Sequence, residues 1–167
     1  MKYQKESLDL NKLCCIVTAY RGELETLISS EPENYLQTDI SSFGKPFPFG
    51  CCLNSSKILA EFLSRHFGMN SLKLVSSNGN EHYWLEYAET IYIDITADQF
   101  DTKNISPTIV DYKEKCEFHK HFEVKGLKKS NLFEILHHHP ISNFAKRLEA
   151  IVIFKSNRIN FLNKERF

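Results

Sequence analysis

One stretch, residues 47–63, most constrains how this chain can fold, because it joins a proline-rich approach to an amphipathic helix. Pro46 and Pro48 favour extended backbone in the residues that precede them, and Gly50 permits a sharp bend. Apolar residues then recur at the three- and four-residue spacing of one helix face, namely Ile58, Leu59, Phe62, Leu63 and Phe67. The pattern predicts a buried helix that ends at Gly68 in a left-handed cap.

Two adjacent cysteines, Cys51 and Cys52, stand where this helix should start. The first backbone N–H groups of a helix have no partner within the helix, and the positive end of its dipole lies there, so both favour a thiolate over a thiol. A cysteine nucleophile would be well placed at this point. A cysteine at a helix start can also be only a small buried apolar residue, and this second interpretation stays open.

Length and composition narrow the class of protein. A chain of 167 residues is typical of one domain, so we expect residues 1–167 to form it, with its core in residues 47–100. Basic and acidic residues balance at 21 each, which gives no electrostatic reason to expect nucleic acid as a partner. No apolar run is long enough to span a membrane, and the polar first residues do not resemble a signal peptide. Five cysteines in this arrangement predict reduced thiols in the cytoplasm, without a disulfide framework.

The remaining periodicity predicts an α+β fold. Residues 8–30 have helical spacing, with Cys14 and Cys15 expected in its buried face. Short strands follow the cysteine helix and form an antiparallel meander packed on it, at residues 72–76, 81–87 and 91–96. We expect residues 97–115 to be a loop. The C-terminal third is expected to hold a strand and two helices, at residues 116–124, 131–139 and 142–154.

Two of these strands can complete a catalytic relay, because a cysteine nucleophile needs a base and the base needs an orienting group. His82 opens the second strand and Asp94 lies in the third. A turn centred on Ala88 would pair His82 with Asp94, and Trp84 with Tyr92, all on one face of the sheet. An aspartate in a run as apolar as residues 91–95 needs a partner, because an unpaired buried carboxylate is costly.

The order of these motifs resembles a known family. Gly50-Cys-Cys-Leu-Asn-Ser-Ser is followed by His82-Tyr-Trp-Leu-Glu and then by Ile93-Asp-Ile-Thr-Ala-Asp-Gln-Phe. The set resembles the bacterial transglutaminase-like branch of the papain-like fold, which includes leader peptidases of lasso-peptide maturation together with amide-transferring and deamidating relatives. The resemblance implies a papain-like core, a Cys-His-Asp triad, a thioester intermediate, and a peptide or protein substrate without a cofactor. The sequence signature of papain proteases around the cysteine is absent.

The family pattern also selects the nucleophile. A small residue follows the family's cysteine by four positions, and apolar pairs follow later on the same face. Counting from Cys52 gives Ser56 and then the apolar stripe, whereas counting from Cys51 puts Lys57 and Glu61 on the buried face. We therefore expect Cys52 to be the nucleophile.

Other site residues and two other functions stay open. The backbone N–H of Cys52 and a side-chain donor would stabilise the oxyanion, with Gln99, Tyr83 and Asn54 as candidates and Trp84 as a wall of the substrate site. A binding module that kept the fold and lost activity is one alternative. A metal-binding protein that uses histidines of the C-terminal third, which are His119, His121 and His137 to His139, is the other.

Overall fold

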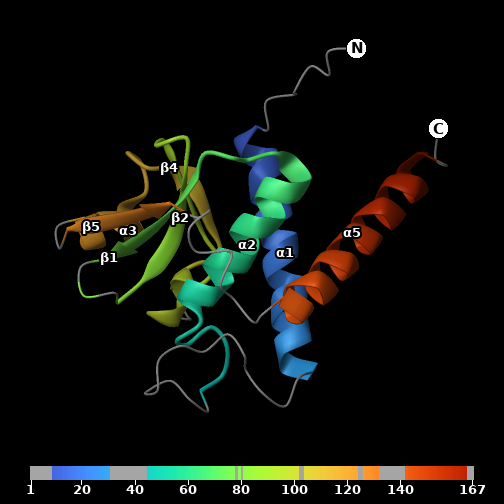
Figure 1. Cartoon of the computed structure of the whole chain (residues 1–167), viewed down its shortest axis with the longest axis horizontal. Coiled ribbons are helices and arrows are strands. Elements are labelled where there is room, and N and C mark those ends of the chain that lie inside the picture. The colour runs from blue at the N-terminus through green and yellow to red at the C-terminus, as the bar shows by residue number, and fades with distance from the viewer. Residues whose placement is uncertain are drawn as a thin grey trace.

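A five-stranded antiparallel sheet with helices on both faces organises the computed structural model of this protein (Figure 1). The structure describes residues 9–30, 45–77, 79, 81–101, 104–123, 126–131 and 142–164. The chain order of its elements is α1 (Leu10–Ser30), α2 (Cys52–Phe67), β1 (Leu72–Ser77), β2 (Tyr83–Tyr87), β3 (Ile91–Asp94), a 3-10 turn η2 (Ala97–Gln99), β4 (Ile109–Tyr112), α3 (Glu117–Glu123), β5 (Leu127–Asn131) and α5 (Ser142–Lys164). The expected α+β class is confirmed.

The sheet has the strand order β4-β3-β2-β1-β5, and its alternating side chains serve two separate cores. Leu74, Leu85 and Ile93 are buried in the larger core together with residues of α1, α2 and α5. On the opposite face Trp84 and Tyr92 are buried against α3. The side chains of His82, Asp94 and His119 lie on this second face, between the sheet and α3.

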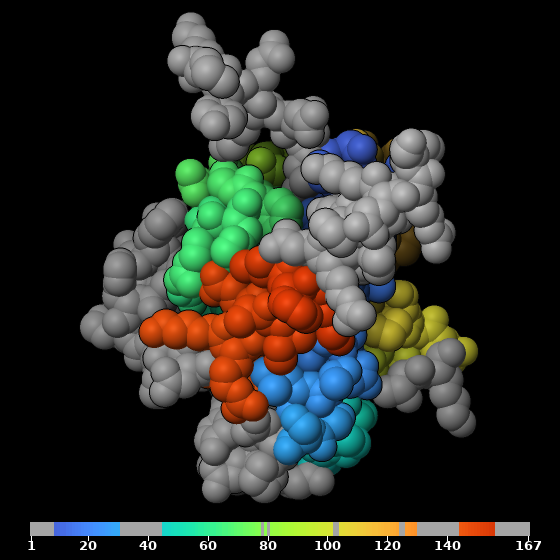
Figure 2. Space-filling model, turned by 90° about the vertical axis from the view of Figure 1, so that its right-hand side faces the viewer, coloured from blue at the N-terminus to red at the C-terminus, as the bar shows by residue number. Residues whose placement is uncertain are grey.

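The helices form layers outside the sheet. In Figure 1, α2 lies between the sheet and α5, with α1 beside it. Figure 2 shows α5 outermost, lying over the C-terminal part of α1. None of the helices in the described ranges is both long enough and apolar enough to cross a membrane.

The cysteine helix has the predicted boundaries, but the segment that precedes it has a different backbone conformation from the predicted one. It starts at Cys52, and Gly68 caps its end with a left-handed φ of 64°. Gly50 also has a positive φ, of 69°, as expected for a sharp bend. The residues before it are not extended, because the amides of Phe49 and Cys51 donate to the carbonyls of Pro46 and Pro48 at 3.2 and 3.0 Å and close a tight turn.

The β2–β3 hairpin has a different register from the predicted one. Leu85 pairs with Ile93 and Tyr87 with Ile91, so the turn is centred on Glu89 and not on Ala88. Both Ala88 and Glu89 have positive φ, of 48° and 62°. The shift is two residues, and side chains alternate with a period of two, so the expected residues still share a face.

Three other predictions about local structure were wrong. Cys14 and Cys15 are exposed, because the buried stripe of α1 passes through Leu13 and Val17. Residues 117–123 form the helix α3 and not a strand. The segment 109–112, which was expected to be part of a loop, is an edge strand of the sheet, and the other edge strand, 127–131, was not predicted. The predicted helix 131–139 and His137 to His139 lie outside the described residues, except that residue 131 ends β5.

A buried ion pair fixes the segment after β3 to α1. The guanidinium of Arg21 donates two hydrogen bonds of 3.0 Å to the carboxylate of Asp98, and it also donates to the carbonyls of Ile95 and Pro107. The same group lies 4.4 Å above the ring of Phe47, in the turn before the cysteine helix. Arg21 therefore ties together the two loops that flank the candidate site.

Replacing this arginine should destabilise the protein strongly. Arg21→Met leaves Asp98 as a buried carboxylate without its cation, so we expect a loss of roughly 3–5 kcal/mol of unfolding free energy in urea denaturation. Arg65, whose side chain is 48% exposed, offers a matched control, and Arg65→Met should cost less than about 1 kcal/mol. The double variant Arg21→Met, Asp98→Leu should recover much of the loss. Equal losses of unfolding free energy in Arg21→Met and Arg65→Met would contradict this role of Arg21.

Candidate active site

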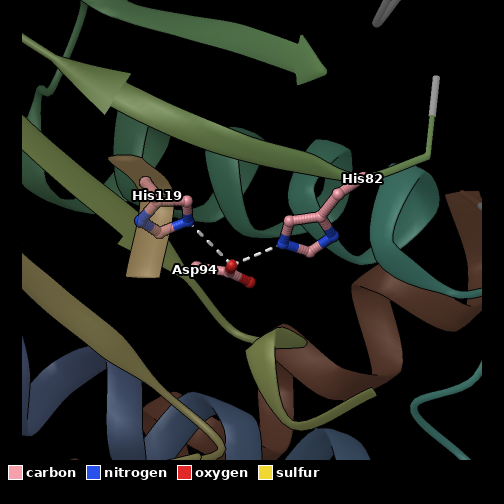
Figure 3. A group of neighbouring side chains, drawn as sticks. All are labelled: His82, Asp94 and His119. Atoms are coloured by element: carbon pink, nitrogen blue, oxygen red, sulfur yellow. Dashed lines mark hydrogen bonds and ion pairs between the residues drawn. The ribbon is translucent and has the colours of Figure 1, made fainter. Parts of the chain in front are cut away.

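A histidine and an aspartate meet at the end of the β2–β3 hairpin. His82 directly precedes β2, and its amide donates to the hydroxyl of Ser77 at 3.0 Å. Asp94 is the last residue of β3. The Nε2 atom of His82 lies 2.6 Å from Oδ2 of Asp94, and both side chains are fully buried. The structure thus brings together the two residues that were expected to share a face (Figure 3).

The carboxylate of Asp94 is fully occupied by donors. Its Oδ2 atom also accepts a hydrogen bond of 3.0 Å from Nε2 of His119, and Oδ1 accepts one of 2.8 Å from the amide of Thr96. Burial by itself would raise the pKa of Asp94, but the two imidazoles lower it below its usual range. Asp94 is therefore an ionised carboxylate inside the protein.

His82 is held in its protonated form by this neighbour. Burial by itself lowers the pKa of His82, but the charge and hydrogen bond of Asp94 and a hydrogen bond with Cys52 raise it, with the net result of about 9. At neutral pH the ring is an imidazolium. Its Nε2 faces Asp94, which leaves Nδ1 as the atom that faces Cys52.

The two cysteines at the helix start have different surroundings. Cys52, the first residue of α2, is 6% exposed and hydrogen-bonds with His82. Cys51 is fully buried, belongs to the larger core, and directs its thiol at the carbonyl of Phe49 at 3.5 Å. Ser56, four residues after Cys52, is also buried. The thiol that faces the histidine is that of Cys52.

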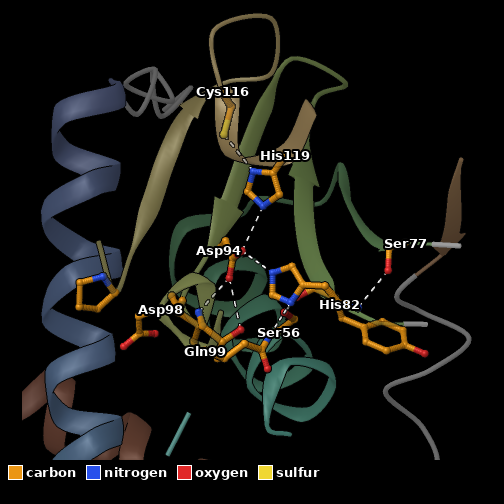
Figure 4. Close-up of polar contacts among 12 residues, drawn as sticks. Ser56, Ser77, His82, Asp94, Asp98, Gln99, Cys116 and His119 are labelled. Atoms are coloured by element: carbon orange, nitrogen blue, oxygen red, sulfur yellow. Dashed lines mark hydrogen bonds and ion pairs between the residues drawn. The ribbon is translucent and has the colours of Figure 1, made fainter. Parts of the chain in front are cut away.

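Gln99 contacts the same imidazole from the η2 turn. Its amide nitrogen lies 2.6 Å from Nδ1 of His82, and Figure 4 shows the two side chains next to each other. The neighbouring Asp98 is held by Arg21. An amide group can turn either its N–H or its carbonyl to such a position. Gln99 can therefore accompany His82 in both of its protonation states, next to the thiol of Cys52.

The other sequence candidates lie around this centre. Trp84 is fully buried and stacks on His82 at 5.5 Å, so it packs behind the imidazole and is not an open wall. Asn54 is also buried, on α2. Tyr83 is partly exposed, and burial together with the nearby Cys52 raises the pKa of its hydroxyl. Among these residues, Tyr83 and Gln99 retain exposed surface beside Cys52.

Aromatic rings shield the imidazole from the other side, and they were not predicted. Phe100 and Phe118 meet the ring of His82 edge-on, at 5.0 and 6.0 Å, and Phe122 lies 5.4 Å away. Phe100 is 47% exposed, so one apolar ring lies between His82 and solvent. Phe100 directly follows Gln99 in the chain, which makes it part of the segment that Arg21 anchors.

His119 is the residue that the sequence interpretation misplaced. The segment was interpreted as a strand with His119 and His121 on one face, but α3 buries His119 completely and leaves His121 exposed. The available signal was the three-residue spacing of Cys116, His119 and Phe122, all of which are buried. With helical spacing, the three residues would have been assigned to one buried face.

His82, Asp94 and His119 are also the one group in the described ranges that could hold a metal ion, since their ligand atoms lie within 4.8 Å of one another. Two ligands that are each about 2.1 Å from one tetrahedral zinc ion lie roughly 3.4 Å apart. The distances of 2.6 and 3.0 Å from the two imidazoles to Asp94 are shorter than that. They fit hydrogen bonds.

Comparisons with protein-family models, with curated proteins and with solved structures give no match to this chain. The chemistry of the site must therefore be derived from its own geometry.

The pairing of His82 with Asp94 should make stability depend on pH. Folding raises the pKa of His82 from 6.5 to about 9, so protonation of His82 stabilises the folded state. This contribution is fully present when the pH is below 6.5, the pKa of the unfolded chain, and it is lost as the pH rises through about 9. We expect the unfolding free energy of the protein, minus that of His82→Gln, to fall by roughly 3 kcal/mol between pH 6.5 and 9.5. Urea denaturation across this range would measure it. A difference that stays constant with pH would mean that His82 is not protonated.

Proposed function

We propose that this protein is a cysteine-dependent hydrolase or acyltransferase that acts on a peptide or amide bond through a thioester. In this proposal Cys52 is the nucleophile, His82 is the general acid and base, and Asp94 orients the imidazole, on a core of the papain-like, transglutaminase-like kind. The observation that supports it best is the buried His82–Asp94 pair directed at a thiol on the first residue of a helix.

The reaction follows from the charges at the site. Imidazolium and thiolate form a pair, and the thiolate of Cys52 attacks the carbonyl carbon of the substrate, which forms a C–S bond and an oxyanion. His82 then gives its proton to the leaving amine as the C–N bond breaks, which leaves a thioester. Neutral His82 next takes a proton from water or from an amine, which attacks the thioester carbonyl. A C–O or C–N bond forms, the C–S bond breaks, and the imidazolium–thiolate pair is restored. Asp94 keeps one tautomer of His82 throughout.

Two donors are available for the oxyanion. The backbone N–H of Cys52 lies in the first turn of α2 and so is not required by the hydrogen bonds within the helix. The amide of Gln99 is the second donor, because it already lies at His82 Nδ1 and needs only to rotate to direct its N–H at the new oxyanion. Arg21 and Asp98 fix the turn from which Gln99 extends.

The surroundings suit an uncharged part of a peptide or protein. The exposed ring of Phe100 and the partly exposed Tyr83 both lie beside the Cys52–His82 pair. The mechanism uses only side chains and backbone amides of the chain itself and requires no cofactor.

Two other functions are tested by the same experiments. A binding module of the same fold would retain the geometry without a reactive thiol. A metal protein would bind its ion at His82, Asp94 and His119. Elemental analysis of the purified protein separates the metal protein from the enzyme, and the reactivity of Cys52 separates the binding module.

Alkylation should show an activated thiol. Because Cys14 and Cys15 are exposed and react through accessibility alone, the experiment starts from a variant with both replaced by serine. At pH 6, iodoacetamide should then modify Cys52 before Cys51 and Cys116, as followed by intact mass and peptide mapping. His82→Ala should slow the reaction about tenfold or more, while Asp94→Asn should slow it less. The exposed His121 is the matched control, and His121→Ala should have no effect. Equal labelling of the three cysteines would favour the binding module.

Serine replacements should identify the nucleophile. Once a peptide or amide substrate is found, Cys52→Ser should abolish turnover, whereas Cys51→Ser should leave most of it, because Cys51 belongs to the core and does not face His82. Asp94→Asn should also depress turnover, since the imidazole loses its orienting acceptor. If Cys51→Ser is the inactive variant, the assignment of the helix face is wrong by one residue.

A further inference from the structure

We infer that His119 is a positioning residue of this site, which holds Asp94 as a neutral imidazole with its proton on Nε2, and that Cys116 donates to its other ring nitrogen. The role rests on the proposed function, because it concerns the residue that orients the general base.

The two histidines hold one carboxylate oxygen from two elements. His82 and His119 both direct Nε2 at Oδ2 of Asp94, at 2.6 and 3.0 Å (Figure 3). Their rings are nearly parallel, with an interplanar angle of 9°, and both are fully buried. Thr96 holds the other oxygen of Asp94. The carboxylate is therefore fixed at both oxygens, and only one of its partners, His82, also contacts the nucleophile.

On its far side, His119 contacts the thiol of Cys116. Sγ of Cys116 lies 2.9 Å from Nδ1 of His119 (Figure 4). Since Nε2 must donate to the carboxylate, Nδ1 of a neutral ring is an acceptor, and the thiol of Cys116 donates to it. Burial raises the pKa of Cys116, which keeps that thiol protonated. Cys116, His119 and Asp94 thus repeat the arrangement of the proposed triad, with a cysteine that is buried as Cys52 is.

The charges around His119 allow one imidazolium at this carboxylate. The groups that face it are Asp94 and Tyr92 from β3, His82 from the start of β2, Cys116, and Glu123 of its own helix. Burial lowers the pKa of His119, and although Asp94 counteracts this, the positive His82 lowers it further. His82 carries the charge, and His119 is a neutral donor.

Nitrogen NMR tests the assignment on the unaltered protein. With uniform 15N labelling and each histidine assigned through a single His→Gln variant, His119 should give the pattern of a neutral ring protonated on Nε2 and should not titrate between pH 5.5 and 8. His82 should give an imidazolium over the same range. A His119 that titrates, or that carries its proton on Nδ1, would overturn the inference. So would stoichiometric Zn²⁺ bound through both Nε2 atoms after the metal is added alone.

Matched variants test the positioning role. The side-chain amide of His119→Gln can place an N–H near the former Nε2, whereas His119→Leu removes the donor and keeps an apolar side chain. Because His119 acts through Asp94, we expect His119→Leu to slow the alkylation of Cys52 at pH 6 about threefold, no more than Asp94→Asn does, and His119→Gln to restore most of the lost rate. Cys116→Ser keeps a donor to Nδ1 and should leave the 15N pattern of His119 unchanged, while Cys116→Ala removes that donor and should shift the Nδ1 resonance with the proton still on Nε2. Equal rates in the Leu and Gln variants, with circular dichroism showing both folded, would refute the role.

The outcomes separate the two proposals. If Cys52 is not activated in the unaltered protein but His119 shows the expected tautomer, the proposed function fails and the hydrogen-bond assignment stands. If Cys52 is activated and His119→Leu leaves its reactivity unchanged, the proposed enzymatic function is supported and the positioning role of His119 is refuted.

Discussion

A buried carboxylate is the constraint on which the rest of this structure depends. An ionised carboxylate without partners inside a protein costs far more free energy than a domain of this size can supply, so every donor at Asp94 is needed. Those donors come from the start of β2, from α3 and from the residues that follow β3 itself. The hairpin must therefore form with its present register, and α3 must cover this face of the sheet.

The short segment 94–99 links two buried polar clusters. At one end Asp94 contacts the two imidazoles, and at the other Asp98 contacts Arg21 of α1. Gln99 extends from the fixed end of this segment to His82. Two ion pairs on opposite sides of the sheet thus determine where one amide group lies. Such double anchoring explains how a loop residue can hold a well-defined position beside a nucleophile.

Sequence periodicity predicted the cysteine helix and the three inner strands, but it did not predict α3 or the two edge strands. The cysteine helix and the three inner strands have long or regular apolar patterns, which depend on local spacing alone. The predicted register of the β2–β3 hairpin was wrong by two residues. Because this is an even number, the prediction that His82 and Asp94 share a face was still correct. Cys14 and Cys15 were assigned from the general tendency of cysteine to be buried, although their phase in α1 pointed to solvent. The helix α3 has only seven residues, too few for its spacing to stand out, so the second imidazole at Asp94 was missed.

The strand order has a consequence for how the protein behaves in concentrated solution. Among the described strands, β4 and β5 form the two rims of the sheet, where backbone groups can pair with another molecule. The rim strand β5 carries the exposed Lys128 and Lys129 in a sequence with little apolar character. The ammonium of Lys129 pairs with the buried Glu86 at 2.8 Å, which leaves the positive charge of Lys128 to oppose an identical strand from a second copy. Pairing would bring like charges together and strip them of water, so the rim at β5 resists intermolecular growth.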